Sequence, residues 1–150
     1  MKKFVLSFVL IFALVNLVSG QSKSNGSLGL GLDLGNGFTF VGPSYRSYFS
    51  ENVVGQGEIL FGGGLTLMNA FYQVRGSFPT AKKIKWYAGG GPTLVMGGGG
   101  TEFLLRLMAG IEANLPETPL SVTFDWRPAL SLKGAGFEPA FFGIGFRFKI

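Results

Sequence analysis

The chain has no cysteine and no histidine. Without cysteine it has no disulfide, no thiol nucleophile and no acylated lipoprotein N-terminus. Without histidine it lacks the most frequent general base and the commonest metal ligand, so a Ser-His-Asp site is excluded. The carboxylates are scattered along the sequence, which gives metal binding little support. We therefore expect no catalytic activity, no cofactor and no metal site.

Long apolar runs and basic clusters are also scarce. After residue 20 no stretch approaches the 18 or so consecutive apolar residues that suggest a membrane-spanning helix. The main concentration of positive charge is Lys82, Lys83 and Lys85, which is too small to predict a nucleic-acid surface. Glycines separated by one residue recur, but none is completed to G-x-G-x-x-G. Phosphate-binding loops are therefore not predicted.

Glycine and phenylalanine, by contrast, are abundant, with 25 and 16 residues among 150. Glycine weakens a helix interior by about 1 kcal/mol relative to alanine. Aromatic residues beside glycines suit pleated strands that meet in tight turns. The length fits one domain, so the composition predicts a single all-β domain.

The first twenty residues have the pattern of a cleaved signal peptide. Lys2 and Lys3 precede an apolar stretch, and the small residues Val18 and Gly20 fit the subsites of a signal peptidase. A retained anchor helix is the alternative, but the apolar run is shorter than the roughly 20 residues of a span. Cleavage would leave eleven basic residues against eight acidic ones, a net charge of +3. We expect an exported chain with a signal peptide at 1–20, a short segment at 21–26 and one domain at 27–150.

Residues 27–150 alternate between apolar and other side chains. In residues 101–115, for example, Phe103 and Leu105 share one face, and Glu102 and Arg106 share the other. A period of two predicts strands rather than helices. Short turn sequences separate the segments, so consecutive strands should pair antiparallel. The eight predicted strands are 27–34, 38–49, 53–61, 65–78, 83–95, 101–115, 120–132 and 140–150. Pro43 is expected to mark a bulge or a shift of register.

The faces opposite the apolar ones carry charges of both signs. The charged residues on these faces are Asp33, Arg46, Glu58, Arg75, Glu102, Arg106, Glu112, Asp125, Arg127 and Arg147. The interior of an eight-stranded barrel is just wide enough to be filled by side chains, so such groups can pair there. An arginine facing lipid near the membrane midplane costs about 2–4 kcal/mol. If the barrel spans a membrane, the arginines point inward, and the ten residues form a structural charge network in the lumen.

Two other all-β architectures fit the alternation: a soluble barrel with its apolar face inward, and a two-sheet sandwich. The last predicted strand, 140–150, favours the membrane barrel, because a soluble protein would blunt such an apolar edge with polar residues. A closed barrel of strands is also the one non-helical way to span a bilayer. We then expect Trp86, Trp126, Tyr45 and Tyr48 in the aromatic girdles at the membrane surfaces.

The sequence resembles the small outer-membrane β-barrel proteins of Gram-negative bacteria, particularly the short glycine-rich ones of Bacteroidota. The stretches that carry the resemblance are "LGLGLDLG", "WYAGGGPTLV", "FDWRPAL" and "GIGFRFKI", within Ser27 to Ile150. The resemblance implies an eight-stranded antiparallel up-and-down transmembrane β-barrel. It also implies a C-terminal signal for the outer-membrane assembly machinery, formed by Phe142, Ile144, Phe146, Phe148 and Ile150. The sequence departs from the commonest form of this signal because it ends in isoleucine instead of an aromatic residue.

These expectations converge on an integral outer-membrane protein of structural or interaction type, with a lumen filled by side chains. Its expected partners are outer-membrane lipid, lipopolysaccharide and, during insertion, the assembly machinery; it is expected to be a monomer that binds no nucleic acid. The alternative is a narrow channel or transporter for small solutes. A soluble secreted binding barrel and a membrane enzyme acting on lipid are weaker alternatives, the last because histidine is absent.

Overall fold

The computed structural model describes residues 26–132 and 136–150, so the expected signal peptide lies outside the described residues. Within them, no helix has the length and apolar character needed to cross a membrane. The strands are β1 (Gly26–Gly35), β2 (Phe38–Tyr48), β3 (Val53–Gly62), β4 (Leu65–Phe78), β5 (Ala81–Gly97), β6 (Gly100–Asn114), β7 (Leu120–Trp126), β8 (Ala129–Ser131), β9 (Phe137–Glu138) and β10 (Phe141–Lys149).

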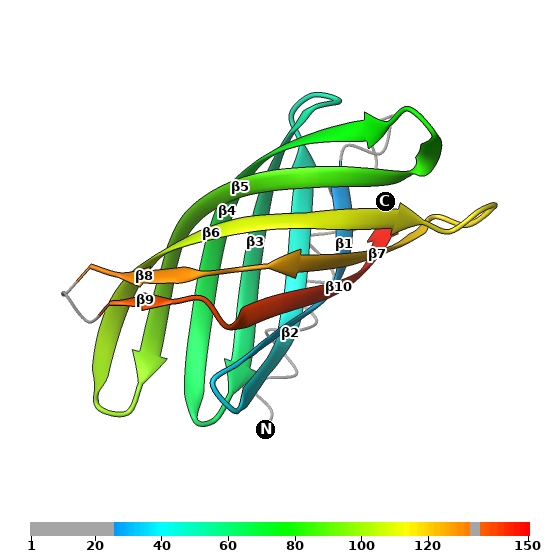
Figure 1. The fold of residues 1–150 in the computed structure, drawn as a ribbon. Helices are drawn as coiled ribbons and strands as arrows, with labels where there is room; N and C mark the ends of the chain where they lie inside the picture. Colours follow the sequence, from blue (N-terminus) through cyan, green and yellow to red (C-terminus); the bar gives the residue numbers. More distant parts are fainter. Residues whose placement is uncertain (1–25, 133–135) are drawn as a thin grey trace, which may run out of the picture.

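The strands form one closed antiparallel sheet. Each strand from β1 to β6 pairs with the next one in sequence, β6 pairs with β7, β7 pairs with β10, and β10 returns to pair with β1. The pairing of β1 with β10 runs from Ser27–Lys149 to Gly35–Phe141. Figure 1 shows the resulting cylinder. The sequence-based prediction of an eight-stranded antiparallel barrel is confirmed, because β7 with β8 and β9 with β10 each make up one barrel strand.

The last two barrel strands are each interrupted at a proline. The sequence pattern predicted residues 120–132 as one unbroken strand, so the first of these breaks was not predicted. β7 ends before Arg127 and Pro128, and β9 ends before Pro139. Proline has no N–H for the ladder. Leu107 N–H still donates to the Pro128 carbonyl at 3.1 Å, so β6 keeps its register past the break. On the other side, residues 139–141 lie opposite residues 127–128, which is the count of a β-bulge.

Pro43, in contrast, marks neither a bulge nor a shift, so that prediction is wrong. The pairs Val41–Phe61 and Ser44–Glu58 on its two sides have the same register. The pairing with β1 also continues through Leu30–Pro43. The register shift in this half of the barrel lies instead between Ser77 and Phe78.

Short turns connect neighbouring strands at both ends of the barrel. At one end, here called the turn end, the pairs Asn36–Gly37, Gly63–Gly64 and Gly98–Gly99 connect their strands, and all six residues have φ between 50° and 83°. Positive φ at both central residues is the mark of a type I′ hairpin turn. The opposite end, called the terminal end, holds the start of β1, the end of β10 and the connections 49–52, 79–80 and 115–119.

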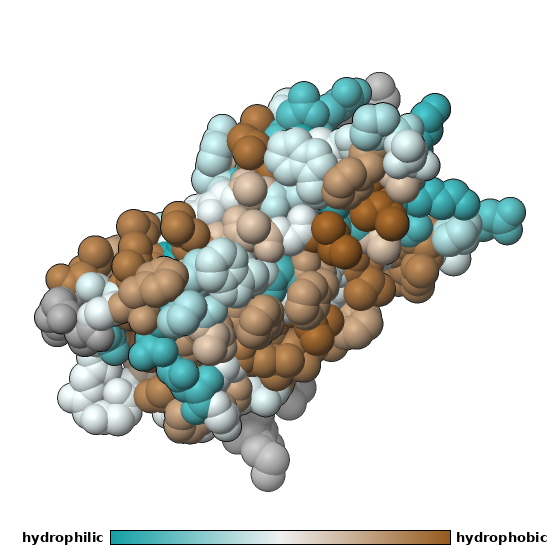
Figure 2. Space-filling model, in the orientation of Figure 1, coloured by the Kyte–Doolittle hydropathy of each residue, from teal (hydrophilic) through white to brown (hydrophobic). Residues whose placement is uncertain are grey.

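The distribution of side chains is the reverse of that in a soluble domain. Among the described residues, buried polar and charged residues outnumber buried apolar ones by sixteen to eight, while twenty-seven large apolar side chains are exposed. Phe124, for example, is 51% exposed and its neighbour Asp125 is 1% exposed. Figure 2 shows hydrophobic residues over much of the visible wall and hydrophilic ones mainly toward the ends. The polar face of the alternation therefore lines the lumen.

Candidate functional site in the barrel lumen

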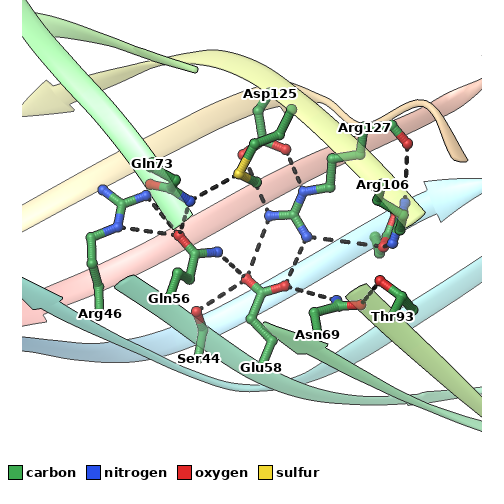
Figure 3. Close-up of polar contacts among 12 residues, drawn as sticks. Ser44, Arg46, Gln56, Glu58, Asn69, Gln73, Thr93, Arg106, Asp125 and Arg127 are labelled. Atoms are coloured by element: carbon green, nitrogen blue, oxygen red, sulfur yellow. Dashed lines mark hydrogen bonds and ion pairs between the residues drawn. The ribbon is translucent and has the colours of Figure 1, made fainter. Parts of the chain in front are cut away.

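Glu58 on β3 is the centre of the polar network in the lumen. Its carboxylate accepts hydrogen bonds from Ser44 Oγ at 3.1 Å, Gln56 Nε2 at 2.6 Å and Asn69 Nδ2 at 3.1 Å. Arg127 Nη1 donates to Glu58 Oε2 at 2.8 Å from the opposite wall. Figure 3 shows these side chains converging on Glu58. Hydrogen bonds that involve an ionised group are roughly twice as strong as neutral ones, so this residue ties several strands together.

Arg127 follows β7 directly and carries the network across to that strand. Its Nε donates to Asp125 Oδ1, and the same carboxylate accepts the hydroxyl hydrogen of Tyr87 at 2.5 Å. The Arg127 guanidinium also lies 5.5 Å from the centroid of the Phe71 ring. Arg127 is completely buried, and burial of a charge is tolerated only when it is paired and hydrogen-bonded. Arg127 meets both conditions.

A second cluster lies toward the terminal end. Arg46 Nη1 forms an ion pair of 2.9 Å with Glu112, and its Nε and Nη2 donate to Gln56 at 3.2 and 2.8 Å. Arg75 approaches Glu112 to 3.5 Å and lies 4.4 Å from the Tyr48 ring centroid. Arg46 and Glu112 are fully buried, while 11% of the Arg75 side chain is exposed. Arg75 thus marks the edge of the network.

A third pair lies toward the turn end. Arg106 on β6 forms two hydrogen bonds to the Asp33 carboxylate on β1, the longer at 3.1 Å, and Arg106 Nη2 reaches the Arg127 carbonyl at 3.3 Å. Asp33 also lies 3.9 Å from Arg127 Nη1. The bidentate geometry matches the guanidinium fork to the carboxylate, and the carbonyl contact joins this pair to the central cluster.

Arg147 on β10 is the least satisfied of the buried cations. Its one acidic contact within 4 Å is Glu58 at 3.6 Å, and none of its three side-chain nitrogens has a hydrogen-bond partner within the described residues. Glu58 already serves Arg127. The network holds five arginines against four carboxylates, so the lumen has a surplus positive charge.

The structure thus brings together nine of the ten predicted network residues, and Glu102 is the exception. Glu102 lies at the turn end with an exposed side chain, where it accepts a hydrogen bond from Ser131 at 3.1 Å. Alternation assigned its face correctly, but it does not show how far a residue lies from the end of a strand. Phe142, Ile144, Phe146 and Phe148 of the expected assembly signal lie on the outer face of β10, with the three phenylalanines between 41% and 52% exposed, and Ile150 follows the end of the strand.

Tyr48 does not belong to an outer aromatic girdle, so that part of the prediction is wrong. Its hydroxyl lies 3.2 Å from Ser27 Oγ in the lumen, because it shares the inward face of β2 with Arg46. Tyr45, Trp86 and Trp126 are on the outer surface, with 39–43% of each exposed.

The sequence reasoning missed the apolar residues that fill part of the lumen. Phe40, Leu60 and Leu67 are buried together near the turn end, with Leu65 and Val95 packed against them. Phe71, Tyr87 and Met108 form a second buried cluster among the arginines. The signal was present for Phe40, since it lies in phase with Ser44 and Arg46 along β2.

Most charged side chains of the lumen are bound by other side chains of the lumen, and Arg147 is the main exception. Across the described residues, no group of three or more histidine, cysteine, aspartate or glutamate side chains is arranged to hold a metal ion. Carboxylates and guanidinium groups are bound mainly to one another and to neutral amides and hydroxyls. Such a lumen stiffens the cylinder and fills it.

The fold defines a closed, eight-stranded antiparallel β-barrel with a polar interior. No protein-family model and no curated protein matches the chain. Among solved structures it is similar to a designed protein described as "De novo design of transmembrane beta-barrels", with a TM-score of 0.65 and 10% sequence identity. The match covers 87% of this chain and 98% of the designed chain. At this identity the likeness concerns the fold alone.

Proposed function

We propose that the chain is an integral outer-membrane β-barrel protein of structural or interaction type, without catalytic activity. The observation that carries the proposal is the apolar outer wall around a polar interior. Soluble monomers rarely expose contiguous apolar patches larger than a few hundred Å², whereas this barrel exposes large apolar side chains on each of its eight barrel strands. A bilayer is the solvent that such a wall matches.

The free energy of the arginines supports the same orientation. Arg46, Arg106, Arg127 and Arg147 are each at most 1% exposed. Each would cost about 2–4 kcal/mol on the lipid face near the midplane. Turned inward, three of them form close ion pairs. The arrangement therefore fits a barrel surrounded by lipid better than one surrounded by water.

Export and assembly complete the proposal. The signal-peptide pattern of residues 1–20 supports export, and the aromatic alternation of β10 supports recognition by the outer-membrane assembly machinery, as in the Bacteroidota-type barrels that the sequence resembles. Lipid and lipopolysaccharide would then contact the outer wall of a monomer.

Membrane fractionation combined with gel mobility tests this proposal. The native protein should fractionate with the outer membrane, and the unheated sample should migrate faster than the heated one because the closed barrel is compact. Recovery from the aqueous phase without detergent would support the soluble secreted barrel instead.

The proposed lumen does not conduct. The buried apolar cluster of Phe40, Leu60 and Leu67 and the ion-paired arginines lie in the lumen, and we expect them to interrupt any continuous water path. The purified protein should give no stable nanosiemens-scale conductance in planar bilayers, and such a conductance would exclude the plugged lumen.

One observation favours a narrow anion-preferring channel as the second candidate. The surplus positive charge in the lumen is concentrated at Arg147, which lacks hydrogen-bond partners. A ring of cationic side chains is one way in which pores select anions. If small currents are found, reversal potentials in a salt gradient should show an anion preference that Arg147→Gln reduces.

A further inference from the structure

Three cationic side chains lie at the opening of the lumen at the terminal end, here called the terminal mouth. Arg75 is near the end of β4, Lys85 near the start of β5 and Lys149 at the end of β10, and Figure 1 shows these strand ends at the same end of the cylinder. Lys149 shares the inward face of β10 with Arg147, and Lys85 shares that of β5 with Tyr87. The charges of Arg75 and Lys149 both act on Lys85, so both repel it.

Contacts around the rim connect Arg75 with Lys149. The Arg75 guanidinium lies 4.4 Å from the ring centroid of Tyr48, and the Tyr48 hydroxyl lies 3.2 Å from Ser27 Oγ. Ser27 on β1 is paired with Lys149 on β10. Arg75 Nε also donates to the Glu51 carbonyl at 3.1 Å. These contacts hold the Arg75 guanidinium against one wall and bring cations from β4 and β10 to the same opening.

The carboxylates near the terminal mouth are too few to neutralise its cations. Glu112 is fully buried, and it is already shared by Arg46 at 2.9 Å and Arg75 at 3.5 Å. Glu51 is exposed in the 49–52 connection and forms no ion pair within 4 Å among the described residues. Neither lysine of the mouth has a carboxylate within 4 Å in the same part of the chain. The terminal mouth therefore carries surplus positive charge.

The three cations of the mouth differ from Arg147 because solvent can reach them. The Arg147 nitrogens are enclosed, whereas 11% of the Arg75 side chain is exposed and Lys85 and Lys149 are half-buried with no enclosed nitrogen. An opening that is lined by one sign of charge concentrates counter-ions. A phosphate monoester carries a charge of about −1.5 to −2 near pH 7 and has three strong acceptor oxygens. Guanidinium and ammonium groups are the side chains that bind phosphate.

We propose that the terminal mouth binds the phosphate group of a small soluble monoester. Arg75 donates to the phosphate from Nη2, which has no partner among the described residues, and the ammonium groups of Lys85 and Lys149 complete the contacts. Because all three side chains lie on inward faces, the ligand enters from the aqueous side of the mouth and not from lipid around the wall. The site requires the closed barrel, but it requires neither conduction nor catalysis.

Titration of methyl phosphate followed by ³¹P NMR tests the site, with the barrel refolded in maltoside micelles, which contain no phosphorus. At about pH 8 methyl phosphate is a dianion, because its second pKa is about 6. Its resonance should shift saturably, and added salt should weaken the binding. Dimethyl phosphate is a monoanion with the diester linkage of a lipid headgroup, and it should bind at least about tenfold more weakly. Phosphatidylglycerol added to the micelles should not displace methyl phosphate; displacement would identify a lipid headgroup as the ligand and contradict the proposal.

A matched pair of variants tests the location. Lys85→Gln removes one charge from the mouth and should weaken methyl phosphate binding about tenfold. Lys82→Gln removes the same charge from the same strand, at an exposed position beside the 79–80 connection, and should change the affinity by less than about twofold. Lys149→Gln, from β10, should repeat the loss seen with Lys85→Gln.

Each variant is first checked for the fast-migrating folded band, so that loss of binding is separated from loss of the fold. No saturable shift with the native barrel, equal affinity for the monoester and the diester, or equal effects of Lys85→Gln and Lys82→Gln would overturn the proposal.

Discussion

Glu58 illustrates how much of the interior depends on one carboxylate. Four side chains from β2, β3, β4 and the β7–β8 junction donate to it, and Arg147 lies 3.6 Å away. Removal of its charge leaves Arg127 with Asp125 and the more distant Asp33, and leaves Arg147 without an acidic neighbour within 4 Å. A buried cation that loses its partner retains its full desolvation cost.

We expect Glu58→Gln to lower the free energy of unfolding by about 3–5 kcal/mol. Urea titration of the barrel refolded into vesicles measures the change. Glu102→Gln is the matched control: it removes the same charge from an exposed carboxylate at the turn end, and the loss should stay below about 1 kcal/mol. Similar losses for the two variants would show that the buried network is not what stabilises the barrel.

Two glycines on different faces of the sheet give a second test at this scale. A Cβ atom added at Gly143 would overlap Arg127 Nε and Asp125 Oδ1 in the lumen, whereas one added at Gly57 would meet no atom within 4 Å. Overpacking typically costs about 1–3 kcal/mol. Gly143→Ala should therefore destabilise by that amount, and Gly57→Ala should change stability by less than about 1 kcal/mol. The same urea titration compares them, and a harmless Gly143→Ala would contradict the close packing around Arg127.

At the scale of the hairpin, the turns at the turn end depend on residues that accept positive φ. Gly98 and Gly99 have φ of 63° and 83°. The left-handed conformation costs roughly 1–2 kcal/mol for an ordinary L residue, so replacing both glycines by alanine should destabilise by about 2–4 kcal/mol. Replacing the pair by Asn-Gly, the sequence that this barrel uses at Asn36–Gly37, should be tolerated. Urea midpoints of the two variants decide the point; indistinguishable midpoints would show that turn geometry does not limit stability here.

The elements show why alternation predicts some features well and others poorly. Period-two patterning depends only on the pleat, so it gave the eight barrel strands and the inward face of Arg106 and Arg127. It did not give the breaks at Pro128 and Pro139, since a proline is harmful only where its missing N–H faces a partner carbonyl in the ladder. Pro43 lies within β2 without any shift of the ladder, which no single-strand pattern can show.

The candidate site was predicted less completely than the fold. The charges of the network follow from the alternation, but their pairing depends on which strands lie opposite each other across the lumen. Arg46 meets Glu112 at 2.9 Å although 66 residues separate them. The phase of Phe40 with Ser44, and of Leu67 with Asn69, places both side chains on the polar face of their strands, but the pattern alone does not show that these apolar residues meet and pack in the lumen.

For the molecule as a whole, the fluorescence of the two tryptophans tests membrane insertion without a label on the protein. Trp86 and Trp126 are the only tryptophans of the chain, and 41% and 43% of their surfaces are exposed on the outer wall. In vesicles of bromine-labelled lipid, the fluorescence of both should be quenched, and aqueous iodide should quench little. Trp86→Phe and Trp126→Phe leave one reporter each and give the depth of the other. Strong quenching by iodide with none by the lipid would show that water surrounds the wall.

The two edges of the sheet meet without a gap: Ile150 N–H donates to the Gly26 carbonyl at 3.1 Å, beside the ladder between β1 and β10. The first and last strands are therefore neighbours in the sheet, and the order of strands around the barrel is circular. A linker joining residues 26 and 150, with new ends opened between Gly98 and Gly99, would give a circular permutant in which every strand keeps its neighbours. Such a permutant would place β5 instead of β10 at the C-terminus. The contribution of the β1–β10 pairing to stability could then be measured separately from the effect of the expected C-terminal assembly signal on insertion.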